Sequence, residues 1–575
     1  MTHTILITSG NRDVDSPKYD HVIVVEELLS AVAQDEILET VSRVSSLDVS
    51  DTGCIDYSIL WRRITKLQTG SLVWSIHLSR QLESRLDELD ITQGTLVCGA
   101  SLQKPYVQVV EDIAERSSLE TRQLGGEQTL SKLFVAARML FIIAKMVLVI
   151  GDWIIARLTG LVTEPHDSKV AYFPAIERLD SSLPIIDLFD AKPHTVVTEP
   201  SSYFHLQFDT KSVLRAYSPA VANQYLSVSE FLGQIRDVGT VTYEVLTLNS
   251  FTPKLVDAVE SEFGVRLDSA TGVLVRKTLS NFHIVRALVI RRSLRAFFSK
   301  NDIQKTIIGT LDPIGRAVTT EACEQNIQVY HIPHSIATTE PPNPKPEVIQ
   351  FVSGDLDVQY YEQVVPEELW WEWVPLGRPY LSNLYQRYTE QRNDQSTIDP
   401  ERTPFEVVIA TVSAPQHIRE QFIKTMCESL QADRFTVTVK PHPDENVKLY
   451  ERIETEYKNV RVIRSGLYNA ICTADLTVTI NSNVGLESMV IGTPAVCFNS
   501  WRPFVVEQTY ALFEEVPIFR SGAEFQSFAT QLDGGKLSDL RERQSEFVEE
   551  SYVLESNTAA KIAEYIQSDD VQVRR

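Results

Sequence analysis

The first part of the chain alternates short apolar runs with longer amphipathic stretches. Strands are predicted at Thr4–Thr8, Leu72–His77 and Gly94–Gly99, and a helix is predicted at Lys18–Gln34. Such alternation is typical of a parallel sheet with helices on both faces. The pattern therefore places the chain in the α/β class.

The alternation returns twice in the second half. Strands at Thr306–Ile308 and Gln328–His331 flank a predicted helix at Ile314–Gln325, which makes one βαβ unit. The polar, proline-flanked stretch Gln391–Pro404 is typical of a linker, and a new strand is predicted directly after it at Phe405–Thr411. A second α/β domain is therefore expected after the linker.

A chain of 575 residues is too long for one core, so two or more domains are expected. We predict an N-terminal Rossmann-like domain over residues 1–380, a linker over 381–404, and a C-terminal Rossmann-like domain over 405–550. Residues 551–575 are expected to form a C-terminal helix and tail. Two helical insertions, at about 131–160 and 281–300, interrupt the α/β pattern of the first domain.

The first insertion is apolar except for one narrow polar stripe. The stripe consists of polar residues that recur every seven positions: Ser131, Arg138, Lys145, Asp152 and Thr159. A packed core helix and a helix lying in the membrane interface both fit this pattern. The charge-free runs Met139–Ala144 and Met146–Gly151 fall short of the ~20 residues that a spanning helix needs.

The second insertion, Asn281–Lys300, is locally basic. Its cationic residues are Arg286, Arg291, Arg292, Arg295 and Lys300. They suit anionic lipid head groups or a negatively charged acceptor. A solvated surface helix with salt bridges is the alternative interpretation.

Charge and cysteine usage narrow the function classes. A net charge of -23 and a pI near 5.0 argue against a nucleic-acid partner. Six scattered cysteines without a CxxC pair indicate buried free thiols in a reducing compartment. The first residues predict a strand and lack the charged segment of a signal peptide. We therefore expect a cytoplasmic protein, with contact to the inner face of the cell membrane as an open alternative.

The stretch Asp475–Phe498 carries the strongest functional pattern. An apolar strand, Leu476–Ile480, leads into the polar turn Asn481-Ser482-Asn483, and a helix opens near Val484. Unpaired backbone N–H groups at a helix start favour an anion. Glu487 follows within about a turn, where its carboxylate suits a ribose or sugar hydroxyl. The stretch therefore predicts a nucleotide-sugar site.

Two other loops are expected at the same sheet edge, because each also follows an apolar strand. The first contains Ser413, and the second is Lys440-Pro441-His442-Pro443. Lys440 or His442 would add positive charge beside a leaving nucleotide. Taken singly, each feature has a plain structural explanation, namely a helix N-cap, a rigid proline turn or a solvated glutamate.

The order of these motifs carries a resemblance. Lys440–Pro443, followed by Thr479–Glu487 and Gly492–Pro494, resembles the GT-B-fold glycosyltransferases of surface and capsule polysaccharide synthesis. CDP-glycerol glycerophosphotransferases and polysialyltransferases are more distant relatives of that pattern. The resemblance covers about Phe405–Ser500 specifically, and residues 306–379 more loosely.

The resemblance implies two Rossmann-like domains facing across a cleft, with the donor nucleotide bound by the C-terminal one. The implied donor-binding residues are Ser413, Lys440, His442, Asn481, Ser482, Asn483 and Glu487. One departure concerns His334-Ser335, where such families often carry His-Gly.

An inverting transfer needs a base near the acceptor hydroxyl, which in this fold comes from the N-terminal domain. Asp312, His334 and Asp13 are the candidates, because each follows a predicted strand. A retaining transfer is the open alternative. No metal is expected, and no cofactor besides the nucleotide-sugar substrate.

The leading hypothesis is a glycosyltransferase that acts on a polysaccharide, glycan or lipid-linked saccharide. A nucleotide-sugar 2-epimerase or a glycerophosphotransferase of the same fold is the first alternative. A non-catalytic component of an assembly or export complex is the second.

Overall fold

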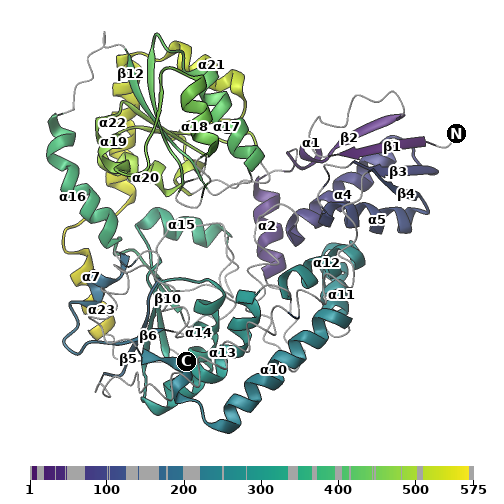
Figure 1. Ribbon diagram of the computed structural model, residues 1–575, viewed down its shortest axis with the longest axis horizontal. Helices are drawn as coiled ribbons and strands as arrows, with labels where there is room; N and C mark the ends of the chain where they lie inside the picture. Colours follow the sequence, from purple (N-terminus) through teal and green to yellow (C-terminus); the bar gives the residue numbers. More distant parts are fainter. Residues whose placement is uncertain are drawn as a thin grey trace.

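The structure is a computed structural model of the whole chain, and it describes most residues between His3 and Ser568. The longer ranges outside the description are 9–18, 48–70, 125–139, 141–167, 198–219, 334–347, 365–371, 395–403, 502–508 and 569–575. The described residues form three parallel sheets. Figure 1 shows each sheet in its own part of the ribbon.

The first sheet has four parallel strands in the order β2-β1-β3-β4. The strands are β1 (His3–Thr8), β2 (His21–Val24), β3 (Gly94–Cys98) and β4 (Glu120–Gln123). The helices that accompany them are α1 (Val25–Ser30), α2 (Gln34–Ser45), α4 (Leu72–Glu88) and α5 (Lys104–Ser117). The order reverses between β1 and β3, because β2 lies on one side of β1 and β3 on the other.

One predicted element of this region is wrong, and another is confirmed only over Val25–Ser30, which is helix α1. The predicted helix Lys18–Gln34 contains the strand β2, because the run Val22-Ile23-Val24 is β-branched throughout and fits a pleated sheet. The predicted strand Leu72–His77 is the start of helix α4. Its N-cap is Ser71, whose hydroxyl accepts a hydrogen bond from the Trp74 backbone N–H at 3.5 Å.

The second sheet has seven parallel strands in the order β11-β10-β9-β8-β5-β6-β7. Its strands are β5 (Val170–Phe173), β6 (His194–Val197), β7 (Ala220–Val221), β8 (Lys305–Ile308), β9 (Gln328–His331), β10 (Val348–Phe351) and β11 (Glu372–Val374). The chain runs outward from β5 to β7 and then returns to place β8 on the other side of β5. This reversal between β5 and β8 is typical of a Rossmann-like sheet.

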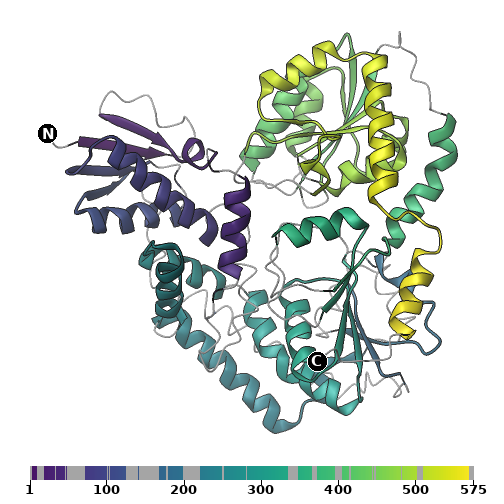
Figure 2. The same cartoon turned by 180° about the vertical axis from the view of Figure 1, so that it is seen from behind.

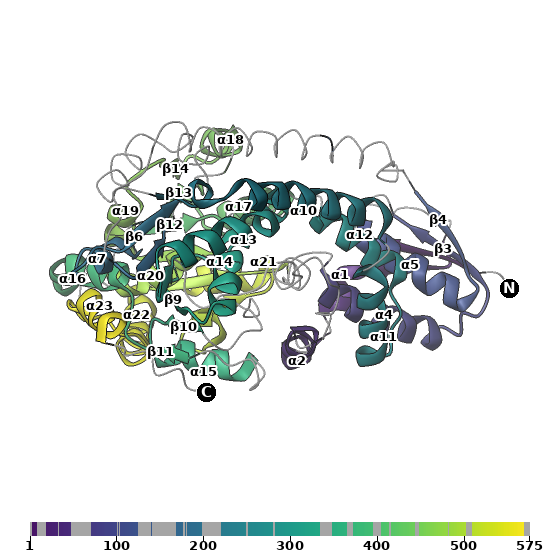
Figure 3. The same ribbon diagram turned by 90° about the horizontal axis from the view of Figure 1, so that it is seen from below.

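The helices of residues 183–364 lie around this second sheet and beside the first one (Figure 1). They are α7 (Leu183–Ile186), η3 (Ala222–Tyr225), α10 (Val228–Thr247), α11 (Phe251–Phe263), α12 (Asp268–Leu279), α13 (Phe282–Lys300), α14 (Pro313–Glu324) and α15 (Asp355–Val364). Helix α12 packs against α5 of the first sheet, and one hydrophobic core runs through both sheets. The predicted domain 1–380 therefore contains two sheets that share a core. Figure 3 shows α12 beside α5.

The third sheet has six parallel strands in the order β14-β13-β12-β15-β16-β17. Its strands are β12 (Phe405–Ala410), β13 (Phe435–Lys440), β14 (Val460–Val462), β15 (Leu476–Thr479), β16 (Ala495–Phe498) and β17 (Ile518–Phe519). Its helices are α17 (Gln416–Ser429), α18 (Lys448–Glu456), α19 (Leu467–Thr473), α20 (Asn483–Ile491), η5 (Thr509–Leu512), α21 (Gly522–Gln531) and α22 (Gly534–Ser551). The order reverses between β12 and β15, again as in a Rossmann-like sheet.

Two helices join the second and third sheets. Helix α16 (Pro379–Asp394) follows β11 and packs against α20 of the third sheet. Helix α23 (Thr558–Ser568) follows α22 and returns to the second sheet, where Ile562 and Ile566 pack into its core beside α7. Figures 1 and 2 show both helices along the same side of the molecule. The α/β fold with two Rossmann-like domains of the GT-B type is confirmed.

The remaining sequence predictions divide between described and undescribed residues. Helix α13 confirms the predicted helix at 281–300, whereas nearly all of the 131–160 insertion lies outside the described residues. Within the described ranges, no helix is long and apolar enough to cross a membrane. Four described cysteines are buried free thiols, and burial raises the pKa of both Cys98 and Cys427 to about 12.

Candidate functional site

The candidate site lies at the carboxyl edge of the third sheet. Strands β13, β12 and β15 are neighbours and run parallel, so the loops that follow them lie side by side. The order reversal between β12 and β15 is where open α/β sheets bind ligands. All three predicted donor-binding loops therefore come to this edge, although Ser413 and Asn481 themselves lie outside the described residues.

Thr411, just after β12, organises the turn that contains His442. Its hydroxyl accepts a hydrogen bond from the His442 backbone N–H at 3.0 Å and donates one to Glu445 Oε2 at 2.8 Å. The turn is closed by the Glu445 backbone N–H, which donates to the His442 carbonyl oxygen at 3.0 Å. The Thr411 side chain therefore links the His442 turn to β12.

Glu445 is buried under this turn, with 2% of its side chain exposed. Its carboxylate also accepts a hydrogen bond from the Tyr450 hydroxyl, and Arg419 Nη1 lies 3.7 Å from Oε2. Burial and this hydrogen bond raise the pKa of Tyr450, so the hydroxyl acts as a donor. The sequence predictions did not include Thr411, Arg419, Glu445 and Tyr450. Two signals were present in the sequence, namely a threonine at the end of a predicted strand and an acidic residue shortly after His442-Pro443.

Lys440, the last residue of β13, is half-buried at the same edge. Its ammonium group donates a hydrogen bond to the Pro441 carbonyl oxygen at 2.7 Å. Burial lowers the pKa of Lys440, while the nearby Glu445 carboxylate acts in the opposite sense. Lys440 thus lies where positive charge was predicted, one residue before the His442 turn.

The third loop forms the start of helix α20. Ser482 is its N-cap, and the Ser482 hydroxyl accepts a hydrogen bond from the Val484 backbone N–H at 3.2 Å. From the other side, the Tyr510 hydroxyl donates to the Ser482 carbonyl oxygen at 2.5 Å. Asn483 is the first residue of the helix and is half-buried. The N-terminus of α20 therefore lies at the predicted edge, held by Tyr510.

Glu487 is more enclosed than the sequence suggested. The residue is 1% exposed, and its Oε2 accepts a hydrogen bond from the Tyr468 hydroxyl at 3.1 Å. Tyr468 belongs to α19, which packs against α20. The predicted contact of Glu487 with a ribose or sugar hydroxyl stays a prediction.

The three candidate bases follow strands of different sheets. Asp13 follows β1 of the first sheet, and His334 follows β9 of the second, but both lie outside the described residues. Asp312 follows β8 and is exposed. Its Oδ1 accepts a hydrogen bond from the Gly315 backbone N–H at 2.8 Å, so it caps helix α14.

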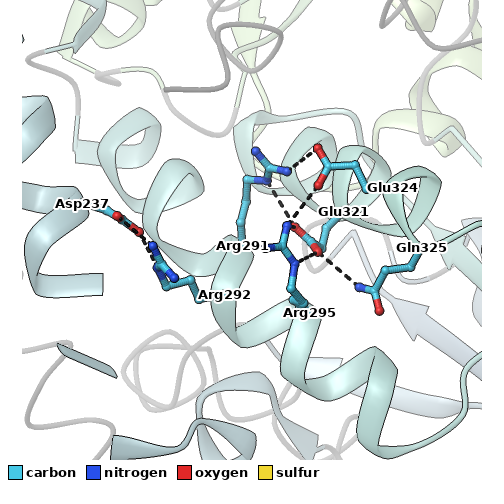
Figure 4. A network of polar contacts seen from close by, with 7 residues as sticks. All are labelled: Asp237, Arg291, Arg292, Arg295, Glu321, Glu324 and Gln325. Carbon is cyan, nitrogen blue, oxygen red and sulfur yellow. Dashed lines mark hydrogen bonds and ion pairs between the residues drawn. The ribbon is translucent and has the colours of Figure 1, made fainter. Parts of the chain in front are cut away.

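The basic helix α13 is paired with acids of its own chain (Figure 4). Arg295 Nε lies 2.6 Å from Glu321 Oε1, and Arg291 Nη2 lies 2.6 Å from Glu324 Oε1. Arg292 contacts Asp237 of α10 at 2.6 Å. These contacts match the alternative interpretation of a salt-bridged helix. They leave less of the positive charge for lipid or a charged acceptor.

The described residues contain no group of three or more His, Cys, Asp or Glu side chains that could hold a metal ion.

Comparison with known proteins gave matches among solved structures only. No family model and no curated protein matches the chain. UDP-GlcNAc 2-epimerase from Neisseria meningitidis, bound to UDP-GlcNAc, is 12% identical with a TM-score of 0.38, covering 69% of this chain and 99% of that one. The wall teichoic acid polymerase TagF is 12% identical with a TM-score of 0.32, covering 48% of this chain and 76% of that one.

A second UDP-N-acetylglucosamine 2-epimerase gives a similar match. It is 11% identical with a TM-score of 0.37, covering 69% of this chain and 94% of that one. At these values the likenesses identify neither the substrate nor the reaction of this chain. The sheet order and the crossing helices α16 and α23 assign it to the GT-B fold, and membership of the capsule transferase family stays a prediction.

Proposed function

We propose that the chain is a glycosyltransferase that moves a sugar from a nucleotide-activated donor onto a polysaccharide, glycan or lipid-linked saccharide. The observation that carries this proposal is the edge of the third sheet, where Lys440 and the His442 turn at the end of β13 and the N-cap Ser482 after β15 lie on either side of β12. The N–H groups at the start of α20 suit a diphosphate. Lys440 would stabilise charge on the departing nucleotide.

The donor nucleotide is proposed to bind across β12, β13 and β15, with Ser413, Asn481, Asn483 and Glu487 completing the donor contacts. The acceptor would then approach from the second sheet, where Asp312, His334 or Asp13 would serve as the base. Asp312 is the described candidate, and its exposure keeps it within reach of a hydroxyl group.

A binding screen tests the donor site. Isothermal titration of the full chain against UDP-, GDP-, CDP- and CMP-sugars should give one nucleotide class that binds. His442→Ala and Ser482→Ala should weaken that binding at least tenfold. Ser521→Ala is the matched control, because Ser521 caps α21 in the same unit through an equivalent hydrogen bond. If none of the four classes binds, the transferase proposal is wrong.

Product analysis separates the transferase from its alternatives. A 2-epimerase would convert the donor sugar without an acceptor, and a glycerophosphotransferase would consume CDP-glycerol. A glycerophosphotransferase would also need a basic acceptor face. Because Arg291, Arg292 and Arg295 are paired with acids, α13 gives little support for such a face. A chain that binds donor but turns over no substrate would support the assembly component.

Peripheral membrane contact is also proposed, and α10 is the described surface on which to test it. Four of its side chains form an exposed apolar stripe at helical spacing: Val228 (61%), Leu232 (59%), Ile235 (44%) and Tyr243 (60%). A lipid-linked acceptor would bring such a face to the bilayer interface. Leu232→Glu should then reduce co-sedimentation with vesicles. Equal sedimentation of variant and wild type would rule out α10 as the contact.

A further inference from the structure

Arg419 lies at the candidate donor edge of the third sheet, although it was not among the donor-binding residues predicted from the sequence. It is the fourth residue of α17, the helix that follows β12. Strand β12 lies between β13, which leads to His442, and β15, which leads to Ser482. Arg419 therefore comes from the strand and helix at the middle of the candidate site.

A series of short contacts joins Arg419 to the His442 turn. Arg419 Nη1 lies 3.7 Å from Glu445 Oε2. The Glu445 backbone N–H donates a hydrogen bond to the His442 carbonyl oxygen at 3.0 Å. Glu445 Oε2 also accepts hydrogen bonds from the Thr411 and Tyr450 hydroxyls. The Arg419 guanidinium therefore contacts the same residue that closes the His442 turn.

The ion pair between Arg419 and Glu445 is loose. A separation of 3.7 Å exceeds the range of about 2.7–3.2 Å for N–H hydrogen bonds to oxygen. Two hydroxyl donors already occupy Glu445 Oε2, and within the described part of the chain Glu445 Oε1 has no hydrogen-bond partner. The carboxylate therefore supplies a counter-charge to Arg419 without occupying the donors of its guanidinium.

Arg419 differs from arginines that have a clear structural role. Among the described residues, its buried Nε atom has no hydrogen-bond partner. Arg434 of the same sheet unit, by contrast, donates to the carbonyl oxygens of Ala529 and Thr530 at 3.1 Å and 2.7 Å. The arginines of α13 approach carboxylates to 2.6 Å. The loose pairing of Arg419 leaves hydrogen-bonding capacity that a ligand can use.

Partial burial places the guanidinium between the core and the surface. The Arg419 side chain is 15% exposed, whereas that of Glu445 is 2% exposed, so Arg419 is the member of the pair nearer the surface. A charge in a partly buried position interacts more strongly with an anion than one in water. Arginine stays charged in proteins, and its planar guanidinium offers parallel N–H groups that match two oxygens of a phosphate.

We propose that Arg419 is a further donor-binding residue, whose guanidinium binds phosphate oxygens of the nucleotide donor through two parallel hydrogen bonds. The inference rests on the proposed function, because it takes this edge as the donor site. Lys440 is less suited to this role, because its ammonium group already donates to the Pro441 carbonyl oxygen at 2.7 Å. Arg419 therefore provides the main phosphate contact, and Lys440 adds charge beside it.

A ligand series tests the assignment with the full chain. The ligands are the nucleoside, the nucleotide and the nucleotide-sugar of the class that binds in the donor screen, measured by isothermal titration or, for the nucleoside, by ligand-observed NMR. Arg419→Met should weaken binding of the two phosphate-bearing ligands by at least about tenfold. Binding of the nucleoside should stay unchanged, because the nucleoside carries no phosphate.

Arg452→Met is the matched control. Arg452 forms a similarly loose ion pair of 3.9 Å with Glu420 of α17, but its side chain is 67% exposed. This variant should bind all three ligands like the wild type.

Arg419→Lys keeps the test decisive if the methionine variant does not fold, since Arg419→Met leaves the buried Glu445 carboxylate without its counter-ion. The lysine variant keeps the positive charge but cannot form two parallel hydrogen bonds. It should therefore bind the nucleotide several-fold more weakly than the wild type, with urea denaturation as the check on folding. Wild-type affinity of the lysine variant for the nucleotide would overturn the proposed two-bond contact.

The outcomes separate this inference from the proposed function. If a nucleotide-sugar binds the wild type and a folded Arg419→Met variant equally, the inference is wrong and the transferase proposal is unaffected. Equal weakening of nucleoside and nucleotide would also overturn the inference, because Arg419 would then act on the shape of the site. If no nucleotide-sugar class binds the wild type, the proposed function is wrong and the assignment of Arg419 fails with it.

Discussion

The Thr411 hydroxyl accepts the backbone N–H of His442 at 3.0 Å, across the gap between two neighbouring parallel strands. The same hydroxyl donates to the buried Glu445 carboxylate, so its single proton and one lone pair are both used. The position of His442 at the sheet edge thus depends on a residue 31 positions earlier in the chain.

Replacing this hydroxyl should therefore destabilise the third sheet. Thr411→Val keeps the shape but leaves the His442 N–H and one Glu445 lone pair without their partner. We expect a loss of about 1–3 kcal/mol in the free energy of unfolding, measured by urea denaturation. Thr436→Val is the matched control, because Thr436 is a half-buried threonine on β13. Equal losses in the two variants would show that the hydroxyl of Thr411 has no special role.

Gly485 in α20 should tolerate no side chain. A Cβ there would lie 2.1 Å from the Tyr510 hydroxyl oxygen, which also holds the Ser482 carbonyl. Gly485→Ala should cost about 1–3 kcal/mol through overpacking, seen as a lower thermal midpoint in calorimetry. Gly239→Ala in α10 is the control, since no described atom outside its own stretch of helix lies within 4 Å of its Cβ position. That variant should be neutral or stabilise by up to about 1 kcal/mol.

The strands around the candidate site were well predicted because they are short, apolar and followed by turn residues. The predicted strands Phe405–Thr411 and Leu476–Ile480 each agree with β12 and β15 to within one residue. The start of α4 was misread as a strand because Leu72–His77 is buried on all sides, which hides the helical period of its apolar residues. Burial from every side arises only when the chain packs in three dimensions, so the sequence alone could not reveal it.

Contacts within the site were less predictable than its location. Loop positions follow from strand order, so Lys440, His442 and Ser482 were predicted to meet at one edge. The links Thr411–Glu445 and Tyr510–Ser482 join residues 34 and 28 positions apart, and no periodicity encodes such pairs. Likewise, the separate four-stranded sheet could not be distinguished from an extension of the second sheet, because both follow the same alternation.

The stability of the first sheet should depend on pH through His77. The side chain is fully buried, and burial lowers its pKa from 6.5 to about 4, although Glu36 Oε1 lies 3.5 Å from Nδ1. Between those two values the unfolded chain binds the proton and the folded chain does not. Stability should therefore be complete above pH 6.5 and fall towards pH 4, by roughly 3 kcal/mol in total.

The measurement is urea denaturation of wild type and His77→Phe between pH 4 and pH 7.5. The aromatic replacement keeps the contact with Trp74, whose ring centre lies 6.0 Å away, and removes the titrating group. Between pH 7 and pH 4 the unfolding free energy of the wild type should fall relative to that of His77→Phe by roughly 3 kcal/mol. A constant difference across this range would mean that the imidazole is protonated equally in both states.

The buried ion pairs of α13 provide the sharpest stability prediction. Glu321 is fully buried and contacts Arg295 at 2.6 Å and Arg291 at 3.3 Å. Glu321→Leu should cost about 1–3 kcal/mol, because it removes the buried carboxylate that both arginines contact and leaves only Glu324 opposite them. Lys169→Met is the control, since its ion pair with Asp302 is exposed and worth at most about 1 kcal/mol.

Adding Arg295→Met to Glu321→Leu should restore much of this loss. The pair is then replaced by apolar groups of similar size, and Arg291 keeps its contact of 2.6 Å with Glu324. Urea denaturation of the single and double variants measures the recovery. If the double variant is as unstable as Glu321→Leu, the cost arises from altered packing of α13 against α14, and the charge at Glu321 is not its cause.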